Sequence, residues 1–414
     1  MGEITSVEGI RAHFPALGRH DNGLPVAYLD GPGGTQVPQV VVDAMSDYML
    51  HHNANTHWVY PTSVETDKLI SLSRAALADF LGGQADEIAF GANTTTLLFH
   101  LARAIGRDLS EGDELIVTEL DHHANVAPWQ AIAAERKLVL RWLPVNVQTF
   151  SHEAGALEKL ISPRTRVVAI GAASNALGTI SPVQEMVSIA RNAGVFTVVD
   201  AVHYAPHNLT DAQAIGADFL LASAYKFHGP HLGVIRGRRE AMAALDLPKL
   251  EPAPDNVPER FETGTQNHEG IVGAAAAVDF LASLTSQLEP SETRRQRLAR
   301  VMSVLEQRSE ALFLHLWEGL VGIEGLSLYG PPPGSNRTPT LSFRLRDHSP
   351  ESVARNLAKR GLYVSHGDFY ASTVARKLGF SEEGFVRVGC ACYTSGDEIG
   401  RLVSAVKDLA AGRA

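Results

Sequence analysis

Between residues 81 and 250, short apolar runs alternate with longer stretches of helical character, and no other feature of the chain restricts its fold as strongly. Strands that are apolar on both faces and separated by helices are typical of a largely parallel sheet covered by helices on both sides. We therefore predict an α/β fold built on a mostly parallel, seven-stranded sheet. Its strands are expected at 87–90, 114–117, 138–140, 167–170, 196–200, 219–221 and 233–235.

The sequence pattern changes after residue 250. Proline and acidic side chains predict a loop at 250–265, and an alanine-rich stretch predicts a helix at 271–284. Further helices are expected at 291–318, 349–360 and 397–410, and strands at 340–344, 362–364 and 385–388. This mixture predicts a small α+β C-terminal domain at 286–414 beside a large ligand-binding domain at 31–285. The N-terminal segment, 1–30, is expected to pack with the small domain.

The composition excludes several classes of protein. A net charge of -10 over 414 residues argues against a nucleic-acid partner and against binding to an anionic membrane surface. No apolar run approaches the roughly 20 residues of a membrane span. The two cysteines, Cys390 and Cys392, have no metal-binding spacing, so we expect no metal site and a reducing, cytoplasmic location.

Asp200 and Lys226 indicate the chemistry of the predicted site. Asp200 ends one predicted strand, and Lys226 follows the next strand along the chain. Ligands of such sheets bind at the carboxyl ends of the strands. A lysine and an aspartate at this edge suit pyridoxal 5'-phosphate (PLP), because a lysine amine holds its aldehyde as a Schiff base and a carboxylate keeps its ring nitrogen protonated. Alone, Lys226 would be interpreted as a surface residue.

Other short patterns follow neighbouring strands in a compatible order. Residues 93–96, Asn-Thr-Thr-Thr, open a helix and could bind phosphate, or they could simply cap it. His122 could stack on a cofactor ring, or could pair with His123 at a metal, or could be a loop histidine. Asn175 could place its amide against the ring hydroxyl, or belong to an ordinary turn. Arg387, on a predicted strand, could hold a substrate carboxylate bidentately, or form a surface salt bridge.

Taken together, these segments resemble the cysteine desulfurases and their relatives in the class V aminotransferase family of fold-type I PLP enzymes. The resemblance covers nearly the whole chain. The segments that carry it are 27–30 (Ala-Tyr-Leu-Asp), 53–57 (Asn-Ala-Asn-Thr-His), 121–130, 174–178, 198–201, 222–230, 261–267 and Arg387.

The resemblance implies a role for each matching residue. Lys226 would bind PLP and move protons, Asp200 would pair with the pyridinium, and His122 would stack on the ring. Thr265 would reach the phosphate of a neighbouring subunit, which implies a homodimer. The remaining cofactor contacts would come from Thr94, Thr95, Asn175, His203, Ser223 and Tyr225. The amino-acid substrate would be bound by Arg387, Asn175 and His57.

The chain also departs from the pattern of the desulfurases. These enzymes need a cysteine on a mobile loop, but the corresponding residues here, 365–371, read Ser-His-Gly-Asp-Phe-Tyr-Ala. If the strand at 385–388 continues to 392, Cys390 and Cys392 face away from Arg387, because side chains alternate along a strand. We expect them to be buried structural thiols. Four further departures surround the predicted pocket: the turn Gly31-Pro32-Gly33-Gly34-Thr35, Trp58 in place of arginine, His203 in place of glutamine, and Tyr225 in place of histidine.

We therefore predict a PLP-dependent lyase or transferase acting on a small, sulfur-containing amino acid by β-elimination of the C–S lyase type. Lys226 would remove the Cα proton, and the products would be pyruvate and ammonia. This route needs no nucleophilic cysteine. His366 or Asp368 would protonate the leaving group. The alternatives are a cysteine desulfurase using Cys390 or Cys392, an aminotransferase or epimerase, and a non-catalytic protein that has kept the fold.

Overall fold

The structure is a computed structural model, and it describes residues 4–285 and 291–413. The seven predicted strands form one sheet in the order β4-β10-β9-β8-β7-β5-β6. In this sheet β10 runs antiparallel to the other six strands. The strands are β4 (Ile88–Gly91), β5 (Glu114–Thr118), β6 (Val139–Leu143), β7 (Thr165–Gly171), β8 (Phe196–Asp200), β9 (Phe219–Ser223) and β10 (Gly233–Gly237).

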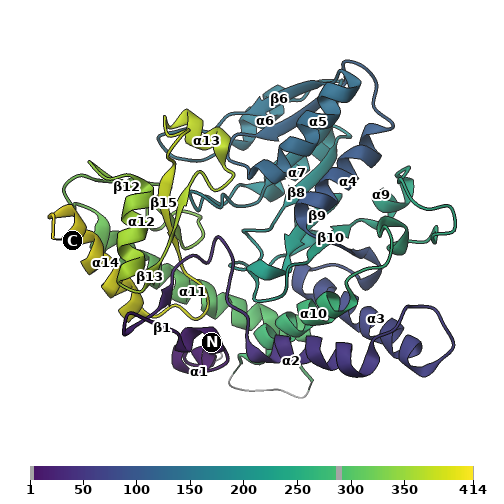
Figure 1. Cartoon of the computed structure of the whole chain (residues 1–414). Coiled ribbons are helices and arrows are strands. Elements are labelled where there is room, and N and C mark those ends of the chain that lie inside the picture. Colours follow the sequence, from purple (N-terminus) through teal and green to yellow (C-terminus); the bar gives the residue numbers. More distant parts are fainter. Residues whose placement is uncertain (1–3, 286–290, 414) are drawn as a thin grey trace.

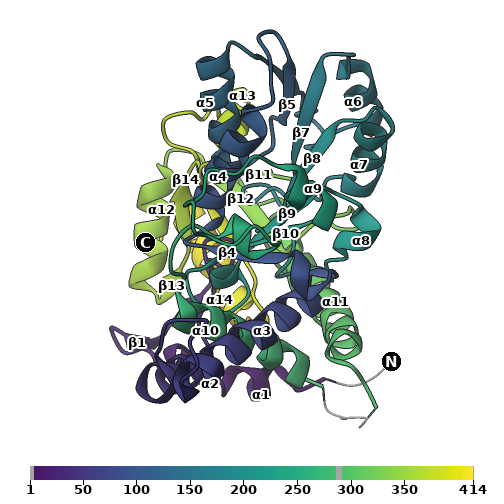
Figure 2. The same ribbon diagram turned by 90° about the vertical axis from the view of Figure 1, so that its right-hand side faces the viewer.

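Helices cover both faces of this sheet because its central strands are apolar on both sides. Along β7, Val167 and Ala169 pack into one hydrophobic cluster, whereas Val168 and Ile170 pack into another. Figure 2 shows α5 on one side of β5 and β7, and α6 and α7 on the other. The helices of this part are α3 (Pro61–Leu81), α4 (Thr94–Gly106), α5 (Ala127–Arg136), α6 (Ala154–Leu160), α7 (Val183–Asn192), α8 (Ala212–Ile215), α9 (Arg239–Ala244) and α10 (His268–Ser283).

The C-terminal elements form a second, antiparallel sheet in the order β11-β12-β15-β14, which lies beside the large sheet (Figure 1). Its strands are β11 (Leu326–Tyr329), β12 (Thr340–Leu345), β14 (Ser365–Gly367) and β15 (Phe385–Gly389). The helices are α11 (Arg294–Leu320), α12 (Pro350–Lys359), α13 (Ser372–Lys377) and α14 (Gly396–Ala410). The strands predicted at 340–344 and 385–388 are confirmed. The structure adds β11, β14 and α13, which the sequence pattern does not predict.

The N-terminal segment joins the two sheets. It contains α1 (Val7–Arg11), the hairpin of β1 (His20–Asp21) and β2 (Leu24–Pro25), and β3 (Ala27–Tyr28), which pairs in parallel with β13 (Leu362–Tyr363). After it come α2 (Gln39–Asp47) and a π-helical turn at Tyr48–His52. The division at 1–30, 31–285 and 286–414 stays a prediction, and its residues 1–3, 286–290 and 414 lie outside the described residues. None of the helices described is long and apolar enough to cross a bilayer.

Candidate active site

A cavity lies at the carboxyl ends of β7, β8 and β9 and at the N-terminus of α4. Asp200 is the last residue of β8, and Lys226 ends a 3-10 turn that follows β9 directly. Nine of the residues predicted to bind the cofactor line this one cavity: Thr94, Thr95, His122, Asn175, Asp200, His203, Ser223, Tyr225 and Lys226. The strand order of the large sheet therefore brings together residues that are up to 132 positions apart.

Lys226 has a buried amine with a lowered pKa, which suits it to nucleophilic attack. Its side chain is only 7% exposed, and its Nζ donates a hydrogen bond to the carbonyl of Pro32. Burial, assisted by the nearby charge of Arg387, lowers the pKa of Lys226 from 10.5 to about 7. An amine with such a pKa is substantially uncharged near neutral pH and can attack an aldehyde.

Asp200 is a buried carboxylate at the floor of the cavity. Its Oδ1 accepts a hydrogen bond of 2.9 Å from the backbone N–H of Val202. Burial raises the pKa of Asp200 to about 6. Among the residues that the structure describes, no cation forms an ion pair with Asp200. A buried carboxylate in this state favours a positively charged partner, and a protonated ring nitrogen is such a partner.

His122 presents a neutral ring to the cavity. Its Nδ1 accepts a hydrogen bond of 3.1 Å from the N–H of Ala124, so the ring proton belongs on Nε2. Burial and the charge of Lys226 lower the pKa of His122 to about 4. The described residues contain no group of three His, Cys, Asp or Glu side chains that could hold a metal, so the metal interpretation of His122 and His123 gains no support.

The opposite end of the cavity is suited to an anion. Asn93 caps α4 by accepting a hydrogen bond from the N–H of Thr96, which confirms the capping role for that residue. The hydroxyl of Thr94 lies 2.7 Å from that of Ser223. A helix N-terminus with adjacent hydroxyls favours a phosphate group.

Arg387 lies beside the cavity on β15. The residue is only 4% exposed, and its guanidinium carbon lies 4.1 Å from the centroid of the Phe369 ring, so the surface salt-bridge interpretation is wrong. One nitrogen forms an ion pair of 3.0 Å with Asp30, and another donates to the carbonyl of Asn175 at 3.1 Å. The Nε has no partner among the described residues. Arg387 is therefore a buried cation at the rim of the site.

The segment 365–371, which is predicted to correspond to the cysteine loop of the desulfurases, folds against the site. The amide of Asn175 donates to the carbonyl of Phe369 at 2.9 Å, and the ring of Tyr370 lies 5.4 Å from that of His122. Phe369 and Tyr370 both have a φ of 57°, which bulky side chains rarely adopt. His366 is exposed, and Asp368 accepts a hydrogen bond from the N–H of Tyr370. Neither His366 nor Asp368 lines the cavity.

Both cysteines lie away from the cavity. The strand does not continue to 392, because β15 ends at Gly389 and the chain turns at Ala391–Thr394. The alternation of side chains along a strand therefore does not apply to the cysteines. Cys390 is fully buried in the core of the C-terminal sheet, and Cys392 is partly buried with its Sγ 3.3 Å from His228. Burial raises the pKa of each thiol to about 12, so both stay protonated near neutral pH.

The structure does not bring His57 and Thr265 to this cavity. Both are exposed and line a different cavity of about 890 Å³, which also includes Arg74 and Glu262. The predicted role of Thr265 concerns a neighbouring subunit and stays a prediction. Three residues around the site received no predicted role from the sequence: Asp30, Phe369 and Tyr370.

The model of the aminotransferase class-V family matches residues 27–402. The chain belongs to this family. It is 31% identical to a cysteine desulfurase of Pectobacterium atrosepticum, over 97% of this chain and 98% of the relative. The cysteine desulfurase of Thermococcus onnurineus NA1 has a similar structure, with a TM-score of 0.89, 29% identity and complete coverage of both chains. The cysteine desulfurase CsdA of Escherichia coli gives a TM-score of 0.84 with 25% identity over 99% of both chains.

These comparisons confirm a fold-type I, PLP-dependent enzyme that resembles the cysteine desulfurases. The described residues fit the cofactor. Lys226 offers an amine, and Asp200 offers a carboxylate that forms no ion pair among the described residues. Thr94 and Ser223 offer hydroxyls at a helix N-terminus. In addition, the Oδ1 of Asn175 and the Nδ1 of His203 are buried without a partner in the described part of the chain. Buried polar atoms of this kind require a partner, and the polar edge of a bound cofactor supplies one.

Proposed function

We propose that this class-V enzyme cleaves the C–S bond of L-cysteine, or of a closely related small amino acid, by β-elimination. L-cysteine and water would give pyruvate, ammonia and hydrogen sulfide. The observation that carries this proposal is the position of the thiols. Burial keeps the thiols of Cys390 and Cys392 protonated, and both lie outside the cavity. The segment 365–371, which we predict to correspond to the cysteine loop of the desulfurases, contains no cysteine. The route by elimination needs no thiolate from the protein.

The cavity residues support this chemistry. PLP, when bound, supplies an electron sink for the bonds at the substrate Cα. Lys226, with its pKa of about 7, accepts the Cα proton and can return it. Arg387 has a guanidinium nitrogen without a partner and binds the α-carboxylate. Asp200 would keep the ring nitrogen protonated, and the neutral ring of His122 would pack on the cofactor.

The exposed apolar side chains near residue 60 support the proposal of a homodimer. Leu50, Trp58 and Val59 are 77%, 60% and 98% exposed, and Met49 and Tyr60 are also exposed. Exposed apolar side chains in such numbers mark an interaction surface. His57 and Thr265 lie beside this surface, so we infer that they complete the site of the partner subunit.

Two free cysteines support a reducing, cytoplasmic location.

Cysteine desulfuration is the second candidate, because the relatives above are named for it. This reaction would need Cys390 or Cys392 as a thiolate at the cavity. Product analysis with L-cysteine separates the two candidates. Pyruvate, ammonia and free sulfide support elimination, whereas alanine with a protein-bound persulfide supports desulfuration and overturns our proposal. A purified protein that binds no PLP would overturn both.

A further inference from the structure

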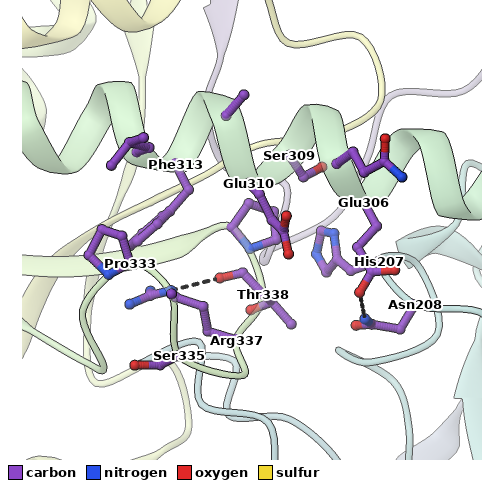
Figure 3. Close-up of a pocket in the computed structure, with 15 residues that line it drawn as sticks. His207, Asn208, Glu306, Ser309, Glu310, Phe313, Pro333, Ser335, Arg337 and Thr338 are labelled. Atoms are coloured by element: carbon purple, nitrogen blue, oxygen red, sulfur yellow. Dashed lines mark hydrogen bonds between the residues drawn. The ribbon is translucent and has the colours of Figure 1, made fainter.

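A second cavity, of about 560 Å³, lies between α11 and the segment that leads into β12 (Figure 3). It is separate from the cofactor cavity, with which it shares no lining residue. Its walls come from three distant parts of the chain: His207 and Asn208 after β8, residues 306–314 of α11, and residues 333–339. Its size is in the range of small-molecule sites.

Arg337 forms one end of this cavity. Its guanidinium carbon lies 3.6 Å above the ring of Phe313. The Nε and Nη2 donate to the backbone carbonyls of Thr338 and Thr340, which fix the plane of the group. The Nη1 is buried without a hydrogen-bond partner, and no carboxylate among the described residues pairs with Arg337. Buried cations are normally paired, so the Arg337 guanidinium favours an oxyanion as its missing partner.

The other end of the cavity is acidic. Glu306 and Glu310 lie one turn apart on α11, and Figure 3 shows their carboxylates on the side of His207, away from Arg337. The amide of Asn208 donates to Glu306 at 2.9 Å, while its Oδ1 is buried without a partner in the described chain. The Nε2 of His207 is also buried without a partner there. These groups suit an ammonium group and its N–H donors.

A ligand that fits both ends carries a carboxylate and an ammonium group. A simple anion would be repelled by Glu306 and Glu310, and a simple cation would leave Arg337 unpaired. We propose that this cavity is a binding site for a free α-amino acid, distinct from the substrate site, with the carboxylate on Arg337 and the amine between Glu306 and Glu310.

His207 connects this site, through its contact with His203, to the cofactor cavity. Its ring contacts that of His203 in an edge-to-face arrangement, with 5.2 Å between the centroids. The Nε2 of His203 lies 3.0 Å from the hydroxyls of both Thr338 and Thr340. Thr338 lines the second cavity, whereas His203 lines the cofactor cavity. An amino acid bound beside His207 and Thr338 therefore changes the surroundings of His203, so the site acts as an effector site.

The binding test uses the full-length holoenzyme and the twenty common L-amino acids, each alone. Thermal shift selects those that bind, and isothermal titration calorimetry measures the affinity of each. Arg337→Met and Glu310→Gln remove one charge at each end of the cavity. Arg344→Met is the matched control, because Arg344 also lies on an aromatic ring (Phe380, 4.5 Å) but is paired with Glu383. Arg387→Ala reports binding at the substrate site.

We expect at least one amino acid whose affinity falls about tenfold or more in Arg337→Met and in Glu310→Gln. The same affinity should be unchanged in Arg344→Met and in Arg387→Ala. If every amino acid that binds depends on Arg387 and none on Arg337 or Glu310, or if none binds, the cavity holds only solvent and the proposal is overturned. Glu310→Gln keeps this test valid if Arg337→Met does not fold.

The effector role has its own readout. The bound amino acid should shift the pH midpoint at which the absorbance of the bound cofactor changes, and His207→Phe should abolish that shift. A midpoint unaffected by saturating amino acid would overturn the effector role. Neither measurement depends on turnover, so the failure of the proposed C–S lyase activity would not be mistaken for failure of this site.

Discussion

The pKa of Lys226 leads to a quantitative prediction for the assembly of the active enzyme. With a pKa of about 7, about three quarters of the amine is uncharged at pH 7.5, against about 0.1% at the ordinary value of 10.5. The apoenzyme should therefore contain about 750 times more reactive amine at this pH than an ordinary lysine would give. Only the uncharged amine attacks the aldehyde of PLP.

The assay is the rate at which apoenzyme binds PLP covalently, followed by absorbance between pH 5.5 and 10. We expect the rate to rise with pH and to level off above a midpoint near 7. Arg387→Met should raise this midpoint, because the charge of Arg387 lowers the pKa of Lys226. Arg344→Met is the control: Arg344 lies on β12 and does not line the cofactor cavity, so its substitution should leave the midpoint unchanged. A midpoint near 10, or a downward move in Arg387→Met, would refute the reasoning.

Three further predictions follow from the described contacts. Arg387→Ala should raise the KM for the amino-acid substrate by about 10- to 100-fold, while the affinity for PLP changes little; equal loss of both would contradict the role of Arg387. Phe343 lies in the fully buried core of the C-terminal sheet, so Phe343→Ala should lower the free energy of unfolding, measured by denaturant titration, by about 3–5 kcal/mol. Val321 is exposed, and Val321→Ala should change this free energy by less than about 0.5 kcal/mol. Tyr370→Gly should raise the free energy of unfolding by up to about 1 kcal/mol, because glycine adopts a φ of 57° without strain and the tyrosine is 72% exposed. A clear decrease in the free energy of unfolding would show that the contact with His122 outweighs the strain.

The sequence predicts the large sheet well because its strands are apolar on both faces. The side chains of residues 167–170 point alternately into two hydrophobic clusters, so this strand is a continuous apolar run. A half-exposed strand would not have such a run. Asp200 and Lys226 are predictable for a related reason. Parallel strands end at the same edge of a sheet, so residues that follow neighbouring strands meet.

Other features depend on contacts between segments that no local pattern connects. Asp30 pairs with Arg387 across 357 positions. The turn of Phe369 and Tyr370 depends on a backbone conformation that aromatic residues seldom adopt, so their identity gives no signal for it. The continuation of β15 to Cys392 fails because Ala391 and Thr394 form a turn, closed by the hydroxyl of Thr394. The sequence gives no signal for Arg337, because its partners are backbone carbonyls and one phenyl ring.

Elimination without a protein thiol is the central claim, and the double variant Cys390→Ser with Cys392→Ser tests it most directly. Given L-cysteine, this variant should release sulfide and pyruvate in equal amounts, at a rate close to that of the unmodified enzyme. Loss of both products from a variant that folds and binds PLP normally, or their replacement by alanine in the unmodified enzyme, would contradict the claim.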